Sequence, residues 1–111
     1  SWHLSDLMVD APDTSGKWHV CAHPGDATNN GGSFLTIPKG TADAAKAFEV
    51  IMHILNADNQ IVEYEDKGNF PANSAAFASE ALHKPTDFLG GQVGAEVFAK
   101  AAETVREALV Y

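Results

Sequence analysis

The fold is decided by residues 33–55, which read SFLTIPKGTADAAKAFEVIMHIL. The first five of these residues are apolar enough to predict a strand that is buried on both faces. Pro38 and Gly40 mark its end, and Thr41 is a good N-cap for a helix over about 42–55. The large apolar residues of that helix recur at helical spacing, at Phe48, Ile51, Met52 and Leu55. The stretch therefore predicts a strand followed closely by a helix.

Another strand is predicted upstream, over residues 17–23, because apolar and polar side chains alternate there. One face would carry Trp18, Val20 and Ala22. The opposite face would carry His19, Cys21 and His23. Pro24 and Gly25 end this strand, and residues 26–32 form a polar, glycine-containing loop before the next strand.

The remaining segments favour helices. The first eight residues predict a short helix, and Asn56 or Asp58 can cap a second helix that runs to about Lys67. Gly68 follows at the position of a left-handed C′ residue. Asn73 can cap a short helix over 74–82, and an amphipathic helix is predicted over about 92–109.

Together these elements predict an α/β fold that is rich in helix and has a small sheet. We expect residues 1–111 to form a single domain or a fragment of a larger one. Residues 1–40 would be its strand–loop–strand region and residues 41–111 its helical region. Two strands are few for a sheet, so the remaining strands are expected elsewhere in a longer chain.

Composition excludes several classes of function. Seven basic residues stand against 15 acidic ones, and the formal net charge of −8 argues against nucleic acid and against anionic membrane surfaces. The single cysteine, Cys21, precludes an intrachain disulfide. No run approaches the roughly 20 apolar residues of a membrane span, and we expect any export signal to have been removed or left out.

Seven stretches follow one another along the chain: GKWHVCAHPG at 16–25, NNGGSFLTIPKG at 29–40, AAKAFE at 44–49, DNQ at 58–60, GNFPAN at 68–73, FLGGQ at 88–92 and EVFAKAA at 96–102. In this order they resemble family 1 extracellular solute-binding proteins, the sugar receptors of bacterial ABC importers and relatives of maltose-binding protein. The resemblance implies two α/β lobes with a sugar held in the cleft between them. This chain would supply part of one lobe of that periplasmic-binding-protein type II fold.

The same resemblance implies a function. The protein would bind a carbohydrate, specifically an oligosaccharide, outside the cell, either at the cell surface or in the periplasm. Closure of the lobes would report the bound sugar to the membrane permease of the importer. We expect no enzymatic activity and no cofactor.

The resemblance also implies the sugar contacts. Trp2 looks like the tryptophan of the family's glycine-x-tryptophan motif and would offer a stacking platform. In the following loop Asn29, Asn30 and Ser33 offer hydrogen-bond donors and acceptors, while Gly31 and Gly32 let the main chain approach a ligand closely. The simpler interpretation of this Asn-Asn-Gly-Gly stretch is a turn between two strands.

The chain departs from the family pattern at three positions. Asn30 stands where the family often has an aromatic residue, and Ala22 and His23 replace a proline and a large apolar residue. These departures leave the identity of the sugar open.

Two other functions are compatible with the residues. His19, Cys21 and His23 alternate on one strand face and offer the donors that zinc or copper prefers. His3, His53 or His83 would then be the fourth ligand. Alternatively, the chain has no ligand and self-associates as a homo-oligomer through apolar surface.

Overall fold

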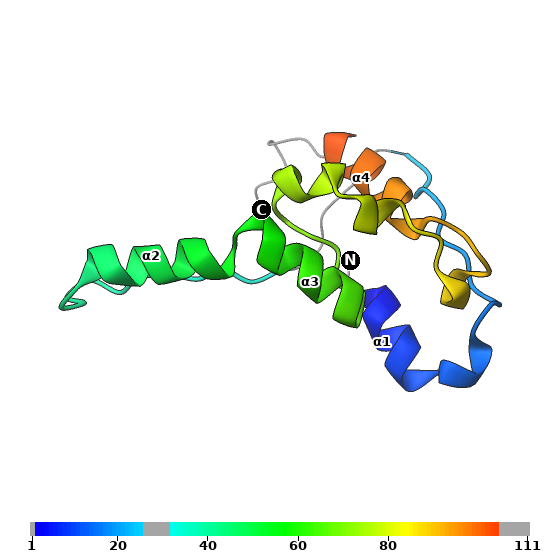
Figure 1. Cartoon of the computed structure of the whole chain (residues 1–111), viewed down its shortest axis with the longest axis horizontal. Helices are drawn as coiled ribbons and strands as arrows, with labels where there is room; N and C mark the ends of the chain where they lie inside the picture. The colour runs from blue at the N-terminus through cyan, green and yellow to red at the C-terminus, as the bar shows by residue number, and fades with distance from the viewer. Residues whose placement is uncertain (1, 26–31, 105–111) are drawn as a thin grey trace.

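The computed structural model describes residues 2–25 and 32–104, and these residues are 58% helical (Figure 1). The α-helices are α1 (His3–Asp10), α2 (Ala44–Ile54), α3 (Ala57–Lys67) and α4 (Gly94–Thr104). Short 3-10 helices join them: η1 (Pro12–Thr14), η2 (Ser74–Ala78), η3 (Glu80–His83) and η4 (Asp87–Leu89). Across these two ranges, no helix combines the length and the apolar character that crossing a membrane requires. The prediction of a helix-rich domain is confirmed.

Three predicted helix boundaries are confirmed in atomic detail. The Asn56 side chain accepts a hydrogen bond from the Asn59 backbone N–H (2.8 Å) and so caps α3. Gly68 ends α3 in the left-handed conformation, with φ of 74°, which glycine adopts without steric cost. Asn73 caps the next helical segment by accepting a hydrogen bond from the Ala75 N–H (3.1 Å).

Three other helix boundaries differ from the prediction. The cap of α2 is Asp43, which accepts a hydrogen bond from the Lys46 N–H (2.9 Å). Thr41 is not the cap because its hydroxyl donates to the Pro38 carbonyl oxygen (2.8 Å), which ties it into the preceding turn. The predicted helix over 74–82 is instead two 3-10 segments, and α4 begins at Gly94 rather than near 92.

The two predicted strands were wrong for the described residues. Residues 17–23 and 33–37 form no strand, and Phe34, expected in a buried strand, is 92% exposed. In the described parts of the chain, β-structure is limited to one isolated antiparallel bridge between Thr86 and Gln92. The physical reason is that a strand needs a hydrogen-bonded neighbour, and these ranges provide none for either segment.

A glutamine side chain takes the place of a strand partner for residues 17–23. The Gln92 side-chain amide donates to the Val20 carbonyl oxygen, and its oxygen accepts from the Val20 N–H, both at 2.7 Å. Next to this contact, Gly16 donates its N–H to the Phe88 carbonyl oxygen (2.9 Å). These bonds hold the extended segment against the turn before α4.

The core consists of two small clusters of buried side chains. Leu4, Phe88 and Leu89 form the first, with Leu7 and Val20 packed against it. Ala81, Leu82 and Ala95 form the second, with Ile61, Tyr64, Phe70 and Phe77 around it. The first cluster joins α1 to the segment before α4, and the second joins α3, η3 and α4.

The molecule is elongated because α2 lies outside this core. The radius of gyration is 16.1 Å, whereas a compact chain of this length has about 13 Å. Figure 1 shows α2 projecting away from the body that contains α1, α3 and α4. No residue of α2 is buried.

Candidate functional site

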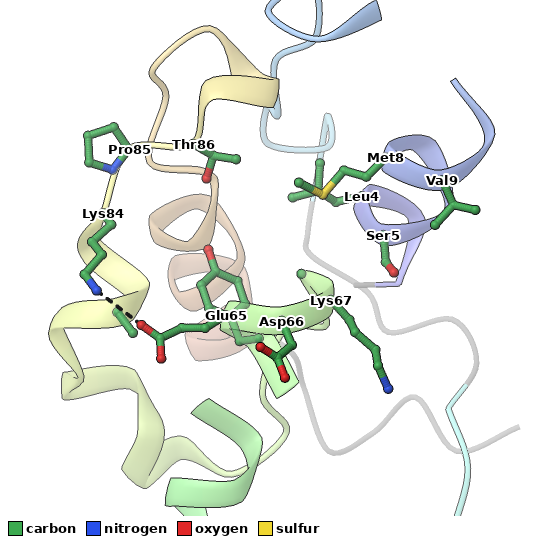
Figure 2. A pocket seen from close by; sticks show the side chains of 13 residues that line it. Leu4, Ser5, Met8, Val9, Glu65, Asp66, Lys67, Lys84, Pro85 and Thr86 are labelled. Carbon is green, nitrogen blue, oxygen red and sulfur yellow. Dashed lines mark hydrogen bonds and ion pairs between the residues drawn. The ribbon is translucent and has the colours of Figure 1, made fainter. Parts of the chain in front are cut away.

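A groove of about 510 Å³ opens between α1, the end of α3 and the segment after η3 (Figure 2). Leu4, Ser5, Met8 and Val9 line it from α1. Residues 64–68 line it from α3, and residues 81 and 84–86 close the third side. Its volume is within the range of small-molecule sites in proteins.

The apolar wall of the groove depends on a close approach between α1 and the end of α3. A Cβ atom at Gly68 would lie 3.5 Å from the Met8 sulfur, an ordinary van der Waals distance, so α1 and this turn are close neighbours. Tyr64 is half-buried at the base of the groove, and this burial raises the pKa of its hydroxyl above the ordinary value of 10.0.

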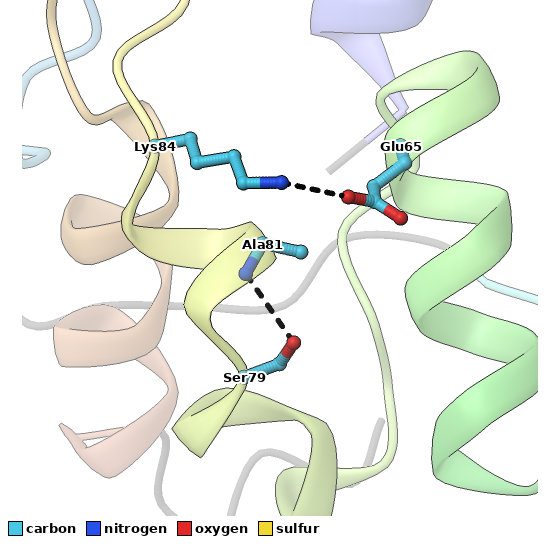
Figure 3. A network of polar contacts seen from close by, with 4 residues as sticks. All are labelled: Glu65, Ser79, Ala81 and Lys84. Atoms are coloured by element: carbon cyan, nitrogen blue, oxygen red, sulfur yellow. Dashed lines mark hydrogen bonds and ion pairs between the residues drawn. The ribbon is translucent and has the colours of Figure 1, made fainter.

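The polar rim carries paired charges. The Lys84 ammonium contacts the Glu65 carboxylate at 3.2 Å, and nearby the Ser79 hydroxyl accepts a hydrogen bond from the Ala81 N–H at 3.3 Å (Figure 3). Both charged groups are largely exposed, so their attraction is screened and stabilises the fold little. The free-energy cost of separating Lys84 from Glu65 is therefore small.

A second charged group lies beyond the groove on α3. Glu63 accepts a hydrogen bond from the Asn69 side-chain amide (2.9 Å) and contacts the Lys67 ammonium at 3.4 Å. The Asn69 hydrogen bond, with a smaller contribution from Lys67, holds the pKa of Glu63 below its ordinary value of 4.5. This carboxylate stays charged at neutral pH and links α3 to Asn69, which follows the Gly68 turn.

The groove offers hydrogen-bonding groups beside its apolar wall. Ser5 and Thr86 provide hydroxyls and Asp66 provides a carboxylate. Figure 2 shows Lys67 extending away from the Lys84–Glu65 pair. Sequence reasoning missed this groove because three segments that are distant in the sequence build it.

The residues predicted to contact a ligand lie in two places. Trp2 directly precedes α1 and is 44% exposed, and its ring lies tilted by 37° against that of His3, with centroids 5.2 Å apart. Gly32 and Ser33 are exposed in the stretch before α2. Asn29, Asn30 and Gly31 lie outside the described residues. Whether Trp2 and this loop share one site stays a prediction.

The metal-binding alternative gains no support from the geometry. His19, Cys21 and His23 are all exposed. The described ranges contain no group of three or more histidine, cysteine or acidic side chains arranged to hold a metal ion. Two of the other histidines lie near carboxylates instead: His3 is 3.9 Å from Asp6, and His83 is 3.6 Å from Glu96.

Comparison with known proteins gives two matches. Residues 1–89 match the family model described as bacterial extracellular solute-binding protein. The lactose-binding protein of Rhizobium radiobacter is 31% identical over 105 residues, which cover 86% of this chain and 25% of that protein. The chain thus spans about a quarter of the length of this relative. None of the solved structures matches the chain.

Proposed function

Because the chain belongs to the family of bacterial extracellular solute-binding proteins, we propose that it is part of an oligosaccharide receptor of an ABC importer. The observation that carries this proposal is the family match over residues 1–89, together with the similarity to a lactose-binding protein. The receptor is exported, binds sugar without transforming it, and delivers it to a membrane permease.

We propose that Trp2 stacks on the apolar face of the sugar. Trp2 is 44% exposed and its ring lies tilted against that of His3, so the residue can meet a ligand. The family resemblance that selects Trp2 assigns no contact to the second tryptophan, Trp18, whose indole N–H donates to the Thr14 hydroxyl oxygen (2.6 Å). The two tryptophans therefore provide a matched pair for experiments.

The loop over residues 29–33 would supply hydrogen bonds to sugar hydroxyls. Its asparagines and serine carry short polar side chains, whose donors and acceptors suit hydroxyl groups. Gly32 has a φ of 114°, which favours glycine, and a Cβ atom there would meet no atom of the described residues within 4 Å. Its backbone is open to a ligand.

We further propose that residues 17–23 and 33–37 become strands of one lobe in the complete receptor. The exposure of Phe34 supports this idea, because neither segment has a partner strand among the described residues. Partner strands would come from the part of the receptor that this chain does not span.

A fluorescence titration tests the proposed function. In a Trp18→Phe variant, Trp2 is the remaining tryptophan, and we expect lactose to quench its emission along a saturable curve. Because one stacking contact and a few hydrogen bonds are available, the expected Kd is about 1–10 mM. The matched Trp2→Phe variant, which keeps Trp18, should show no response. Equal quenching in both variants, or in neither, would contradict the proposal.

A further inference from the structure

The groove between α1, the end of α3 and the segment after η3 is not used by the proposed sugar site, which consists of Trp2 and the loop over residues 29–33. Its volume of about 510 Å³ is enough for a small organic molecule. On the α1 side, Leu4, Met8 and Val9 give it an apolar lining. This lining suits a ligand with an apolar body, and the charges around the groove decide which kind of polar group that ligand carries.

Two helices end beside this groove. Met8 lies in the last turn of α1, Gly68 directly follows α3, and a Cβ atom at Gly68 would lie 3.5 Å from the Met8 sulfur. The two C-terminal ends are therefore neighbours. Each carries a partial negative charge, which favours cations nearby. The last turn of α1 adds the carboxylate of Asp10 and contains no basic residue. The helix ends thus make this side of the groove negative.

The two lysines that line the groove are already paired with carboxylates. Lys84 contacts Glu65 at 3.2 Å, and Lys67 contacts Glu63 at 3.4 Å. Asp66 also lines the groove, in the last turn of α3, and among the described residues it takes part in no ion pair (Figure 2). A carboxylate at this end of a helix gains no stabilisation from the helix dipole, so a cation in the groove would supply the missing counter-charge.

We infer that the groove binds a small organic cation in which one ammonium group is attached to an apolar body. The apolar body covers the lining from α1, and the ammonium group lies near Asp66. The hydroxyl oxygens of Ser5 and Thr86 line the same groove and can accept hydrogen bonds from the ammonium group. The formal net charge of −8 adds a general attraction for cations, which an experiment has to separate from the local one.

Titration of the isotopically labelled chain with phenylethylamine, followed by NMR, tests this inference. The Met8 methyl group and the amides of Tyr64 and Gly68 should shift along one saturable curve, while the indole N–H of Trp2 stays in place. The expected Kd is roughly 1–10 mM, because so small a ligand makes few contacts. Phenylethanol, which has the same apolar body without the charge, should bind at least about fivefold more weakly. Added salt should weaken binding of the amine and not of the alcohol.

Two matched variants separate the local charge from the net charge. Asp66→Asn and Asp58→Asn each remove one exposed carboxylate from α3, but Asp58 lies in the first turn, at the opposite end of the helix. Asp66→Asn should raise the Kd of phenylethylamine about fivefold, and Asp58→Asn should leave it within about twofold. Asp66→Asn should also remain folded, because a carboxylate at this helix end does not stabilise the helix. Equal affinities for amine and alcohol, equal effects of both variants, or no saturable shift at the groove residues would overturn the inference.

Discussion

Leu82→Ala is expected to lower the free energy of unfolding of the chain by about 2–5 kcal/mol. Leu82 is 2% exposed and packs among Ala81, Ala95 and the surrounding aromatic residues of α3 and η2. Removing its side chain leaves a cavity between the three helical segments that this cluster joins. The structure describes seven buried apolar residues, so each contributes a large share of the marginal stability of such a domain.

Urea unfolding followed by circular dichroism measures this effect. Val62→Ala is the matched control on α3, because Val62 is 56% exposed and should change stability by about 0.5 kcal/mol or less. If Leu82→Ala does not fold, Leu82→Val removes less volume and should give a smaller, measurable loss. A Leu82→Ala variant as stable as the control would show that this cluster is not the core.

Gln92→Ala is expected to release residues 17–23 from the body. It removes both hydrogen bonds to Val20 and leaves the half-buried Val20 N–H and C=O without these partners, at a cost of about 1–3 kcal/mol. Hydrogen exchange should therefore accelerate at the Val20 amide by about 10-fold or more, while the amides of α3 change far less.

Gln92→Glu is the conservative comparison for this experiment. A carboxylate can still accept from the Val20 N–H but cannot donate to the Val20 carbonyl oxygen. Protection at the Val20 amide should therefore fall between that of the original chain and that of Gln92→Ala. Unchanged exchange at Val20 in the alanine variant would contradict the role assigned to this glutamine.

The features that were predictable from sequence are those formed by neighbouring residues. The cap by Asn56 and the left-handed Gly68 each depend on backbone groups within four residues. Residue type and spacing therefore indicate them directly. The cap of α2 was misassigned because Thr41 and Asp43 are both good caps. Only the turn after Pro38, which engages Thr41, decides between them.

The two strands were wrongly predicted because an alternation of apolar and polar side chains indicates a preference for the extended conformation. It does not indicate whether a partner strand is present. Residues 17–23 form no strand, and both backbone groups of Val20 bond instead to a side chain 72 residues away. For the same reason sequence reasoning did not find the groove, whose walls come from residues near 4, 64 and 85. Trp2 and the 29–33 loop were selected by family resemblance, and their joint role stays a prediction.

Titration of the isotopically labelled chain with lactose, followed by NMR, tests the central claim most directly. If the chain is a sugar-binding part of a receptor, the indole N–H of Trp2 and the amides of Gly32 and Ser33 should shift along one saturable curve. The indole N–H of Trp18 and the amides of Tyr64 and Gly68 should stay in place. Shifts confined to the groove at Tyr64 and Gly68, or no saturable shift at Trp2, would contradict the account.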